Sequence, residues 1–137
     1  MYQIDSNSIV VDAACSGNPG VMEYRGLDMQ TWKQIFHGGP FPLGTNNIGE
    51  FLAIIHGLVY VQKHPEITTI YSDSQTAISR IKKRKIKTTL TLNDKTAVLL
   101  ERVQKAQDRL QLHRYTVQIV KRDTEKRGEI PADFGRK

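Results

Sequence analysis

The sequence predicts an α/β fold in which helices flank a five-stranded mixed sheet and cover its faces. Short runs of β-branched and aromatic residues alternate with longer segments whose apolar residues recur at helical spacing. The elements follow the order strand, strand, strand, helix, strand, helix, helix, strand. Helical connections imply parallel strands joined by right-handed crossovers. The 137 residues suit a single domain, 1–137.

The first third of the chain predicts three strands. Ser8–Ala13 is followed by the loop Cys15–Gly20, whose Gly, Asn and Pro residues mark an exposed turn. Met22–Leu27 and Lys33–His37 then predict an antiparallel hairpin. We expect the glycines and prolines of residues 38–42 to end the third strand.

The middle of the chain predicts two helices around a buried strand. Apolar residues at helical spacing begin near Asn47 and stop before Pro65. Thr68–Ser72 predicts the strand, and Ser74–Lys83 predicts the second helix. The first, fourth and fifth strands should therefore be parallel, and ligands in such sheets bind outside the carboxyl ends of the strands.

The last third predicts a third helix and a final strand. The helix spans Asp94–Leu110 with Asn93 as its cap, and Tyr115–Val120 alternates inward and outward residues. The apolar stripe of the helix should consist of Ala97, Leu100, Val103, Ala106 or Gln107, and Leu110.

The charge balance favours a polyanionic partner. Twenty Lys and Arg residues against fourteen Asp and Glu residues give a net charge of +6. Six of these bases crowd into eight positions at the end of the second helix: Arg80, Lys82, Lys83, Arg84, Lys85 and Lys87. Such a block is either an interaction surface or a solvated helix end.

Composition also narrows the compartment. The single cysteine, Cys15, excludes an internal disulfide and a multi-cysteine zinc site, which favours a reducing compartment. No apolar stretch approaches the roughly 20 residues of a membrane span, and residues 1–8 have no apolar signal core. We therefore expect a cytoplasmic protein with no membrane association.

Four carboxylates lie where folding alone does not explain them. Asp12 and Asp73 each end an apolar strand, Glu50 lies near the start of an apolar helix, and Asp133 lies near the C-terminus. If folding brings them together, each pair at ~4 Å repels by roughly 4 kcal/mol at an effective dielectric of about 20. The cluster would need cations, and divalent metal is the natural compensation.

The motifs around these carboxylates resemble those of type 1 ribonucleases H. Val11–Gly20 is similar to the opening motif of that family, and Thr45–Glu50 is similar to its Thr-Asn-Asn-x-x-Glu motif. Tyr71–Gln75 resembles its Asp-Ser motif, and Ala132 with Asp133 resembles its last Asp. The resemblance implies a ribonuclease H-like fold and hydrolysis of the RNA strand of RNA/DNA hybrids.

The resemblance also implies a site with two metal ions, expected to be Mg²⁺ with Mn²⁺ as a substitute. Asp12 would bridge the ions, Asp133 would help hold the one that activates water, and Glu50 and Asp73 would hold the one facing the leaving group. The products would carry 5′ phosphate and 3′ hydroxyl ends.

The expected partner is an RNA/DNA hybrid, whose 2′ hydroxyls neutral polar side chains can read across a wide minor groove. The family's contact positions are matched by Cys15, Ser16, Gly17, Asn18, Thr45, Asn46, Asn47, Ser74 and Gln75. Lys82, Lys83 and Lys85 fall where many members carry a basic protrusion, which contacts phosphates. No protein partner is implied.

Each motif also has a purely structural reading. Asn47 and Glu50 fit a capping box, Asp73 or Ser74 fits a helix N-cap, and Asp12 could satisfy donors in the following turn. These readings do not explain why all four carboxylates fall at family positions.

Two departures from the family bear on activity. Residues 114–137 contain no His, where members usually carry one before the last Asp; Glu125 or Glu129 could take its place, or both could be solvated loop charges. Only four residues follow Asp133, so we expect no C-terminal helix. Asp133 would then become ordered when metal and hybrid bind, or be held by the second protomer of a homodimer. The alternative function is a hybrid-binding or duplex-binding protein that cleaves weakly; another nuclease or integrase of the same fold fits the motifs less well.

Overall fold

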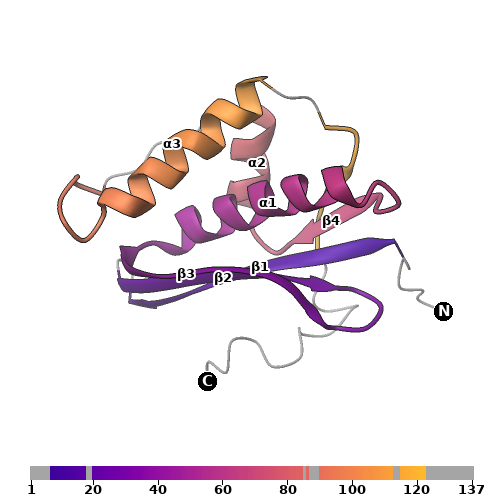
Figure 1. Cartoon of the computed structure of the whole chain (residues 1–137), viewed down its shortest axis with the longest axis horizontal. Helices are drawn as coiled ribbons and strands as arrows, with labels where there is room; N and C mark the ends of the chain where they lie inside the picture. Colours follow the sequence, from indigo (N-terminus) through magenta and orange to yellow (C-terminus); the bar gives the residue numbers. More distant parts are fainter. Residues whose placement is uncertain (1–6, 18–19, 85, 87–89, 113–114, 123–137) are drawn as a thin grey trace.

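The computed structural model describes residues 7–17, 20–84, 86, 90–112 and 115–122. Five strands form one mixed sheet in the order β3-β2-β1-β4-β5, and three helices pack on one side of it (Figure 1). The elements are β1 (Ser8–Gly17), β2 (Gly20–Asp28), β3 (Gln34–Gly44), α1 (Asn46–Lys63), β4 (Thr69–Ser72), α2 (Gln75–Lys83), α3 (Ala97–Leu112) and β5 (Gln118–Lys121).

The order and direction of the strands confirm the sequence prediction. β1 pairs with β2 and β2 with β3 in antiparallel register, whereas β1 pairs with β4 and β4 with β5 in parallel. The expected α/β class with a five-stranded mixed sheet is therefore correct. The expectation that no helix follows Asp133 concerns residues outside the described part of the chain.

The end of β3 differs from the prediction. Residues 38–42, which were expected to break the chain, continue the strand as far as Gly44. β3 is an edge strand, and a proline at a sheet edge removes no ladder hydrogen bond that a neighbour needs. Shifts in the β2–β3 register absorb the irregular segment, so the strand reaches the start of α1.

The first turn of α3 differs from the prediction, whereas Val103, Ala106 and Leu110 are buried as expected. The helix begins at Ala97, which is exposed, and its buried residues include Leu99 where Leu100 was expected. The Asn93 side chain accepts from the backbone N–H groups of Lys95 and Thr96, and the buried Thr96 side chain donates to the Thr91 carbonyl. Because this turn fixes Thr96 inward, the residue three positions later also faces the core.

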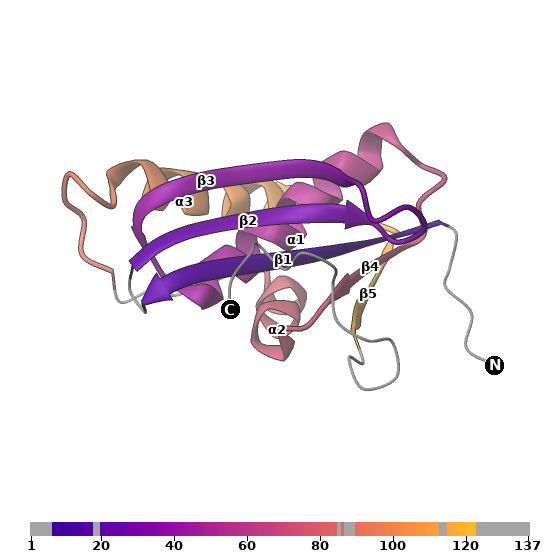
Figure 2. The same ribbon diagram turned by 90° about the horizontal axis from the view of Figure 1, so that it is seen from below.

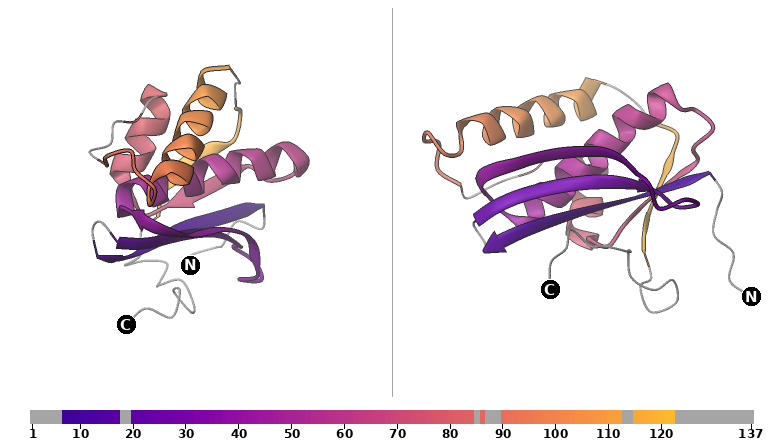
Figure 3. Two further views of the ribbon diagram at one scale, coloured as in Figure 1. Left: turned by 60° about the vertical axis from the view of Figure 1, so that its left-hand side comes forward. Right: turned by 60° about the horizontal axis from the view of Figure 1, so that its bottom comes forward.

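The two faces of the sheet carry different residues. Ile9 and Val11 of β1 face the helices and join the main core, while Val10 lies on the opposite side in a small cluster with Tyr71 and Trp32. Figure 2 shows the sheet from this opposite side, with α1 and α3 behind it. In the described part of the chain all three helices lie on the first of these sides (Figure 3). Helices were expected on both faces, but these three cover one face only. We call the side of Val10 the open face, because none of the described helices covers it.

Close packing of α1 against the sheet places the N-terminal turns of that helix over β1. A Cβ atom added at Gly49 would come within 2.8 Å of the Ala13 Cβ and 2.9 Å of the Met22 sulfur. Real side chains do not approach so closely, so only glycine permits this contact. Glu50 is the next residue and is thereby held near the sheet. None of the helices in the described ranges is both long and apolar enough to cross a membrane.

Candidate active site

Asp12 and Asp73 lie next to each other where the parallel pairing of β1 with β4 ends. Asp12 was expected to end its strand, but β1 continues beyond it to Gly17 in pairing with β2. Val11 pairs with Ser72, so the two aspartates are the next residues along β1 and after β4. Neighbouring strands are about 4.8 Å apart, which puts the two backbones within reach of a shared ligand. Asp12 is only 8% exposed although it is ionisable. This is the carboxyl edge at which α/β sheets bind ligands.

Two buried arginines flank the aspartates. Arg25 of β2 is the direct cross-strand neighbour of Asp12 and is also 8% exposed. On the other side, the backbone N–H of Arg122 donates to the Ser72 carbonyl at 2.8 Å, directly after β5. Arg25, Asp12, Asp73 and Arg122 therefore lie in one row across four neighbouring strands, with the two aspartates in the middle and one arginine at each end. We call these four residues the charged row.

The Arg122 side chain belongs to the open face. Its guanidinium carbon lies 5.9 Å from the centroid of the Trp32 ring, and the residue is only 1% exposed. None of the described residues accepts a hydrogen bond from its three guanidinium nitrogens. A buried guanidinium in this state is energetically costly, which points to a role other than stabilising the fold.

The charged row changes the electrostatics expected from the sequence. Two carboxylates close together repel, and an arginine on the strand beside each adds positive charge that reduces this repulsion. The sequence analysis did not predict the two arginines of the row, although the sequence contains hints of both. Arg25 interrupts an otherwise apolar buried stretch of β2, and Arg122 follows a strand as Asp12 and Asp73 do.

Glu50 lies in the second turn of α1, half-buried, and Thr45 caps this helix. The Thr45 hydroxyl oxygen accepts from the Ile48 backbone N–H at 3.3 Å. The reading of Asn47 as the cap of a box with Glu50 is therefore wrong, because Asn47 is already within the helix. Thr45, the first residue of the Thr45–Glu50 motif, is therefore also the N-cap of α1.

Ser74 caps α2, as one of the structural readings proposed. Its hydroxyl accepts from the Ala77 N–H at 3.0 Å, and its own N–H donates to the Ser72 hydroxyl at 3.1 Å. These bonds fix the junction between β4 and α2, where Asp73 lies. Asp73 itself is not the cap, so that reading does not account for its carboxylate.

The expected metal site is only partly within the described structure. No three His, Cys, Asp or Glu side chains of the described ranges come together as a metal-binding group, and Asp133 lies outside those ranges. Mg²⁺ is commonly held by one or two carboxylates together with water and substrate phosphates. Asp12 and Asp73 at one edge fit that mode of binding. They do not form a closed protein cage.

The expected substrate contacts fall around this edge. The predicted turn at Cys15–Gly20 is too long, because β1 continues to Gly17 and pairs with β2 as far as Gly20. The Cys15 thiol donates to the Gly44 carbonyl at 3.3 Å, which joins the end of β1 to the residue before Thr45. Ser16 and Gly17 are exposed at this end of β1, and Asn18 lies outside the described residues. The exposed amides Asn46 and Asn47 at the start of α1 and Gln75 at the start of α2 are accessible to a ligand.

The basic block divides into two groups. Lys82 and Lys83 are exposed in the last turn of α2, whereas Arg84 turns toward α3. Arg84 donates to the Leu110 carbonyl and its guanidinium lies 5.4 Å from the Tyr115 ring centroid. Lys85 lies outside the described residues. Among the described bases of the block, Arg84 therefore has a packing role and the two lysines remain available to phosphates.

A comparison with known protein families decides the classification. The model of the RNase H family matches residues 5–133, which is almost the whole chain. The chain belongs to the RNase H family. The resemblance read from the motifs is thereby confirmed, and the match includes the segments around all four family carboxylates.

Curated relatives carry the same family name. The Ribonuclease H of Trichodesmium erythraeum is 36% identical over 76 residues, which is 56% of this chain and 48% of that protein. The Ribonuclease H of Oleidesulfovibrio alaskensis is 38% identical over 90 residues, covering 61% and 52%. This RNase H chain thus spans about half the length of the curated relatives it matches.

Solved structures support the fold. LC11-RNase H1, isolated from compost, aligns with a TM-score of 0.56 and 17% identity over 91% of this chain and 89% of that one. RNase H1 from the archaeon Halobacterium salinarum aligns with a TM-score of 0.50 and 18% identity over 91% of each. LC11-RNase H1 has also been solved with an RNA/DNA hybrid and aligns with a TM-score of 0.51 at 17% identity, over 88% of each chain.

Proposed function

We propose that this RNase H family member hydrolyses the RNA strand of RNA/DNA hybrids endonucleolytically. The observation that carries the proposal is the charged row, in which Asp12 and Asp73 lie at the carboxyl edge of parallel strands between two buried arginines. Folding gains nothing from burying this set of charges, whereas a phosphodiester substrate needs both metal ligands and positive charge.

Asp12, Glu50, Asp73 and Asp133 would hold two Mg²⁺ ions, with Mn²⁺ as a substitute. When bound, these ions would supply an activated water and stabilise charge on the phosphate and the leaving 3′ oxygen, giving 5′ phosphate and 3′ hydroxyl ends. Carboxylate oxygens are the ligands that such hard cations prefer.

The chain's other residues would position the substrate. Ser16, Gly17 and Asn18 in the first turn, with Asn46, Asn47 and Gln75 at two helix starts, would contact the sugar edges of the hybrid. Thr45 would grip a phosphate of the DNA strand. Lys82, Lys83 and Lys85 would contact phosphates without reading sequence. The guanidinium groups of Arg25 and Arg122 would attract the anionic backbone toward the aspartates.

A second candidate function is a hybrid-binding protein of the same family that cleaves weakly. Its support is the absence of His from residues 114–137, where family members usually carry one. The same fold and basic surface would serve binding alone, so only an activity measurement separates the two functions.

The test is cleavage of a hybrid labelled on its RNA strand, with Mg²⁺, with Mn²⁺ and with a chelator, beside single-stranded RNA and duplex DNA. We expect metal-dependent cutting of the hybrid alone, lost in Asp73→Asn. Asp108→Asn, which removes an exposed carboxylate from α3, is the matched control and should cut normally. An intact hybrid under every metal condition, with tight binding retained, would favour the binding protein instead.

A further inference from the structure

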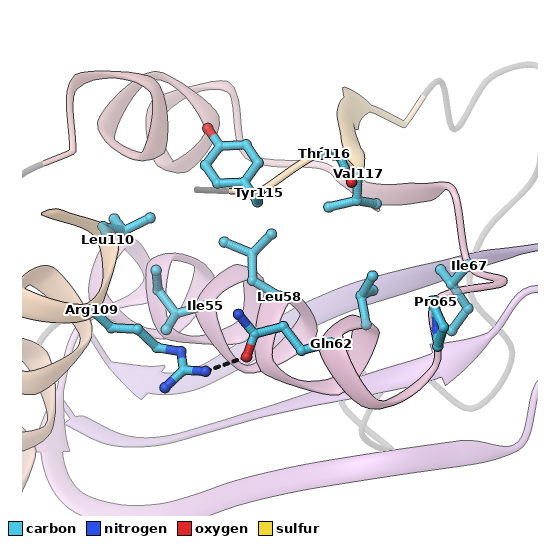
Figure 4. Close-up of a pocket in the computed structure, with 11 residues that line it drawn as sticks. Ile55, Leu58, Gln62, Pro65, Ile67, Arg109, Leu110, Tyr115, Thr116 and Val117 are labelled. Carbon is cyan, nitrogen blue, oxygen red and sulfur yellow. Dashed lines mark hydrogen bonds between the residues drawn. The ribbon is translucent and has the colours of Figure 1, made fainter. Parts of the chain in front are cut away.

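An apolar hollow lies on the helix side of the molecule, away from the charged row. It has a volume of about 220 Å³ and opens between α1, α3 and the segment leading into β5 (Figure 4). Its walls are mainly aliphatic: Ile55, Leu58, Val61, Ile67, Leu110 and Val117. Well-packed interiors rarely keep apolar walls around a space of this size, so the hollow suits an apolar group from outside the core.

Arg109 stands at the rim of this hollow. Its guanidinium donates to the Gln62 side-chain oxygen, as the dashed line in Figure 4 marks, and Gln62 is a neutral partner. A neutral amide fixes the direction of the guanidinium without neutralising its charge. The remaining N–H groups of the fork are available to an oxyanion, which an arginine can bind with two parallel hydrogen bonds.

A second, more open groove continues from the same rim. It shares Ile55 and Arg109 with the apolar hollow and adds the bases Arg102 and Lys105. These three bases lie at positions i, i+3 and i+7 of α3, which places them along one side of the helix. The groove volume is about 320 Å³.

The surroundings do not cancel this positive charge. In the ranges that the structure describes, no Asp or Glu lines either space. Glu66, next to Pro65 at the far end of the hollow, is within 3.7 Å of His64. Asp108 of α3 accepts from Gln104 on the exposed side of the helix. An anion at the rim would therefore meet an uncompensated basic edge.

From the joined apolar hollow and basic rim we infer that this surface binds a small amphiphilic anion. The hydrocarbon body enters the hollow, and an oxyanion head binds Arg109, with Lys105 beyond it. A medium-chain fatty acid has this chemistry, and an alkyl phosphate shares it with a different head. The site is independent of the proposed nuclease edge, because none of its residues belongs to the charged row.

The experiment titrates octanoate, octyl phosphate and the uncharged octanol into the full chain while backbone and methyl NMR signals are recorded. We expect saturable shifts at Ile55, Leu58 and Val117, with either anion binding at least about tenfold more tightly than octanol. The stronger of the two anions identifies the head group. Equal binding of octanol and both anions would overturn the role of the basic rim.

Two variants, Arg109→Gln and Val61→Phe, locate the site, and Lys63→Gln is the control. Arg109→Gln should weaken anion binding about tenfold and leave octanol unchanged, whereas Lys63→Gln, which removes a nearby charge outside both spaces, should change neither. Val61→Phe fills the hollow and should abolish binding of all three probes. Retained binding in Val61→Phe, or no binding to the unaltered chain, would overturn the inference. A dimer of the unaltered chain that Val61→Phe dissociates would assign the hollow to a second copy and overturn it equally.

Discussion

The two faces of the sheet differ in the kinds of residues that they bury. On the helix side, Ile9, Val11 and Ile70 pack against α1 in a core whose main members are apolar. On the open face, Val10 and Tyr71 form a small cluster beside the charged row, in which Asp12, Arg25 and Arg122 are buried and Asp73 is half-buried. Packing explains the first face almost completely, whereas the second keeps charges that packing would exclude. The contrast indicates that the charged row is maintained for chemistry and the apolar core under the helices for stability.

Asp12→Asn tests the contrast with the largest expected effect. The change keeps the size of the side chain but removes its charge, so hybrid cleavage should fall at least about a thousandfold, equivalent to ~4 kcal/mol of barrier. The measurement is single-turnover cleavage, with the thermal transition recorded in parallel. A variant that no longer folds would assign Asp12 to the structural part of the molecule and break the contrast.

Ile54→Ala tests the opposite face. Ile54 is fully buried under the helices, so truncation should cost about 3 kcal/mol of the free energy of unfolding, through lost burial and a cavity. Denaturant titration gives the free energy. The cleavage rate per folded molecule should stay within about threefold of the unaltered chain. A large loss of rate in a folded variant would show that the apolar core also serves the reaction.

Arg122→Met sharpens the contrast within the open face. Methionine keeps the apolar contact with Trp32 and removes a buried guanidinium that none of the described residues accepts hydrogen bonds from. We expect equal or higher stability, by up to about 1 kcal/mol, together with about tenfold slower cleavage. Lower stability with unchanged cleavage would place Arg122 among the residues that hold the fold.

His56 gives the helix side a small dependence on pH. Burial, and then the Arg102 charge, lower the pKa of this imidazole, whose Nδ1 lies 3.0 Å from the Tyr24 hydroxyl. Burial also raises the pKa of Tyr24, so the phenol stays neutral. The folded protein then binds fewer protons at His56 than the unfolded chain does. The contribution of neutral His56 to the free energy of unfolding should therefore be fully present above about pH 6.5 and be lost as the pH drops below it.

The slope is at most about 1.4 kcal/mol per pH unit and smaller in practice, because the ring is only half-buried. Urea titrations between pH 7.5 and 5 measure it. His56→Gln should flatten the slope. An unaltered slope in His56→Gln would assign the dependence to other groups.

The sequence was sufficient for those features that depend on local pattern. The order of elements, the parallel pairing of β1, β4 and β5, and the shared edge of Asp12 and Asp73 all follow from strand ends and helical connections. The site positions came from motifs, and their ligand roles remain predictions. Features that depend on neighbours in space were missed, such as Arg25 opposite Asp12.

Local competition between residues explains the remaining differences. Thr45 rather than Asn47 caps α1, because both residue types favour a cap and the close packing of Gly49 on the sheet fixes where the helix begins. In the first turn of α3, a turn held by Thr96 buries Leu99 in place of Leu100, while the rest of the stripe is as predicted. Spacing alone cannot separate neighbouring phases when Leu99 and Leu100 are both apolar.

Titration of Mn²⁺ into the chain, followed by calorimetry, tests the central claim that the open-face carboxylates act together as a metal site. The account predicts saturable binding that Asp12→Asn and Asp73→Asn each abolish and that Asp108→Asn leaves intact. Saturable binding that survives both Asp12→Asn and Asp73→Asn, or no saturable binding to the unaltered chain, would contradict it.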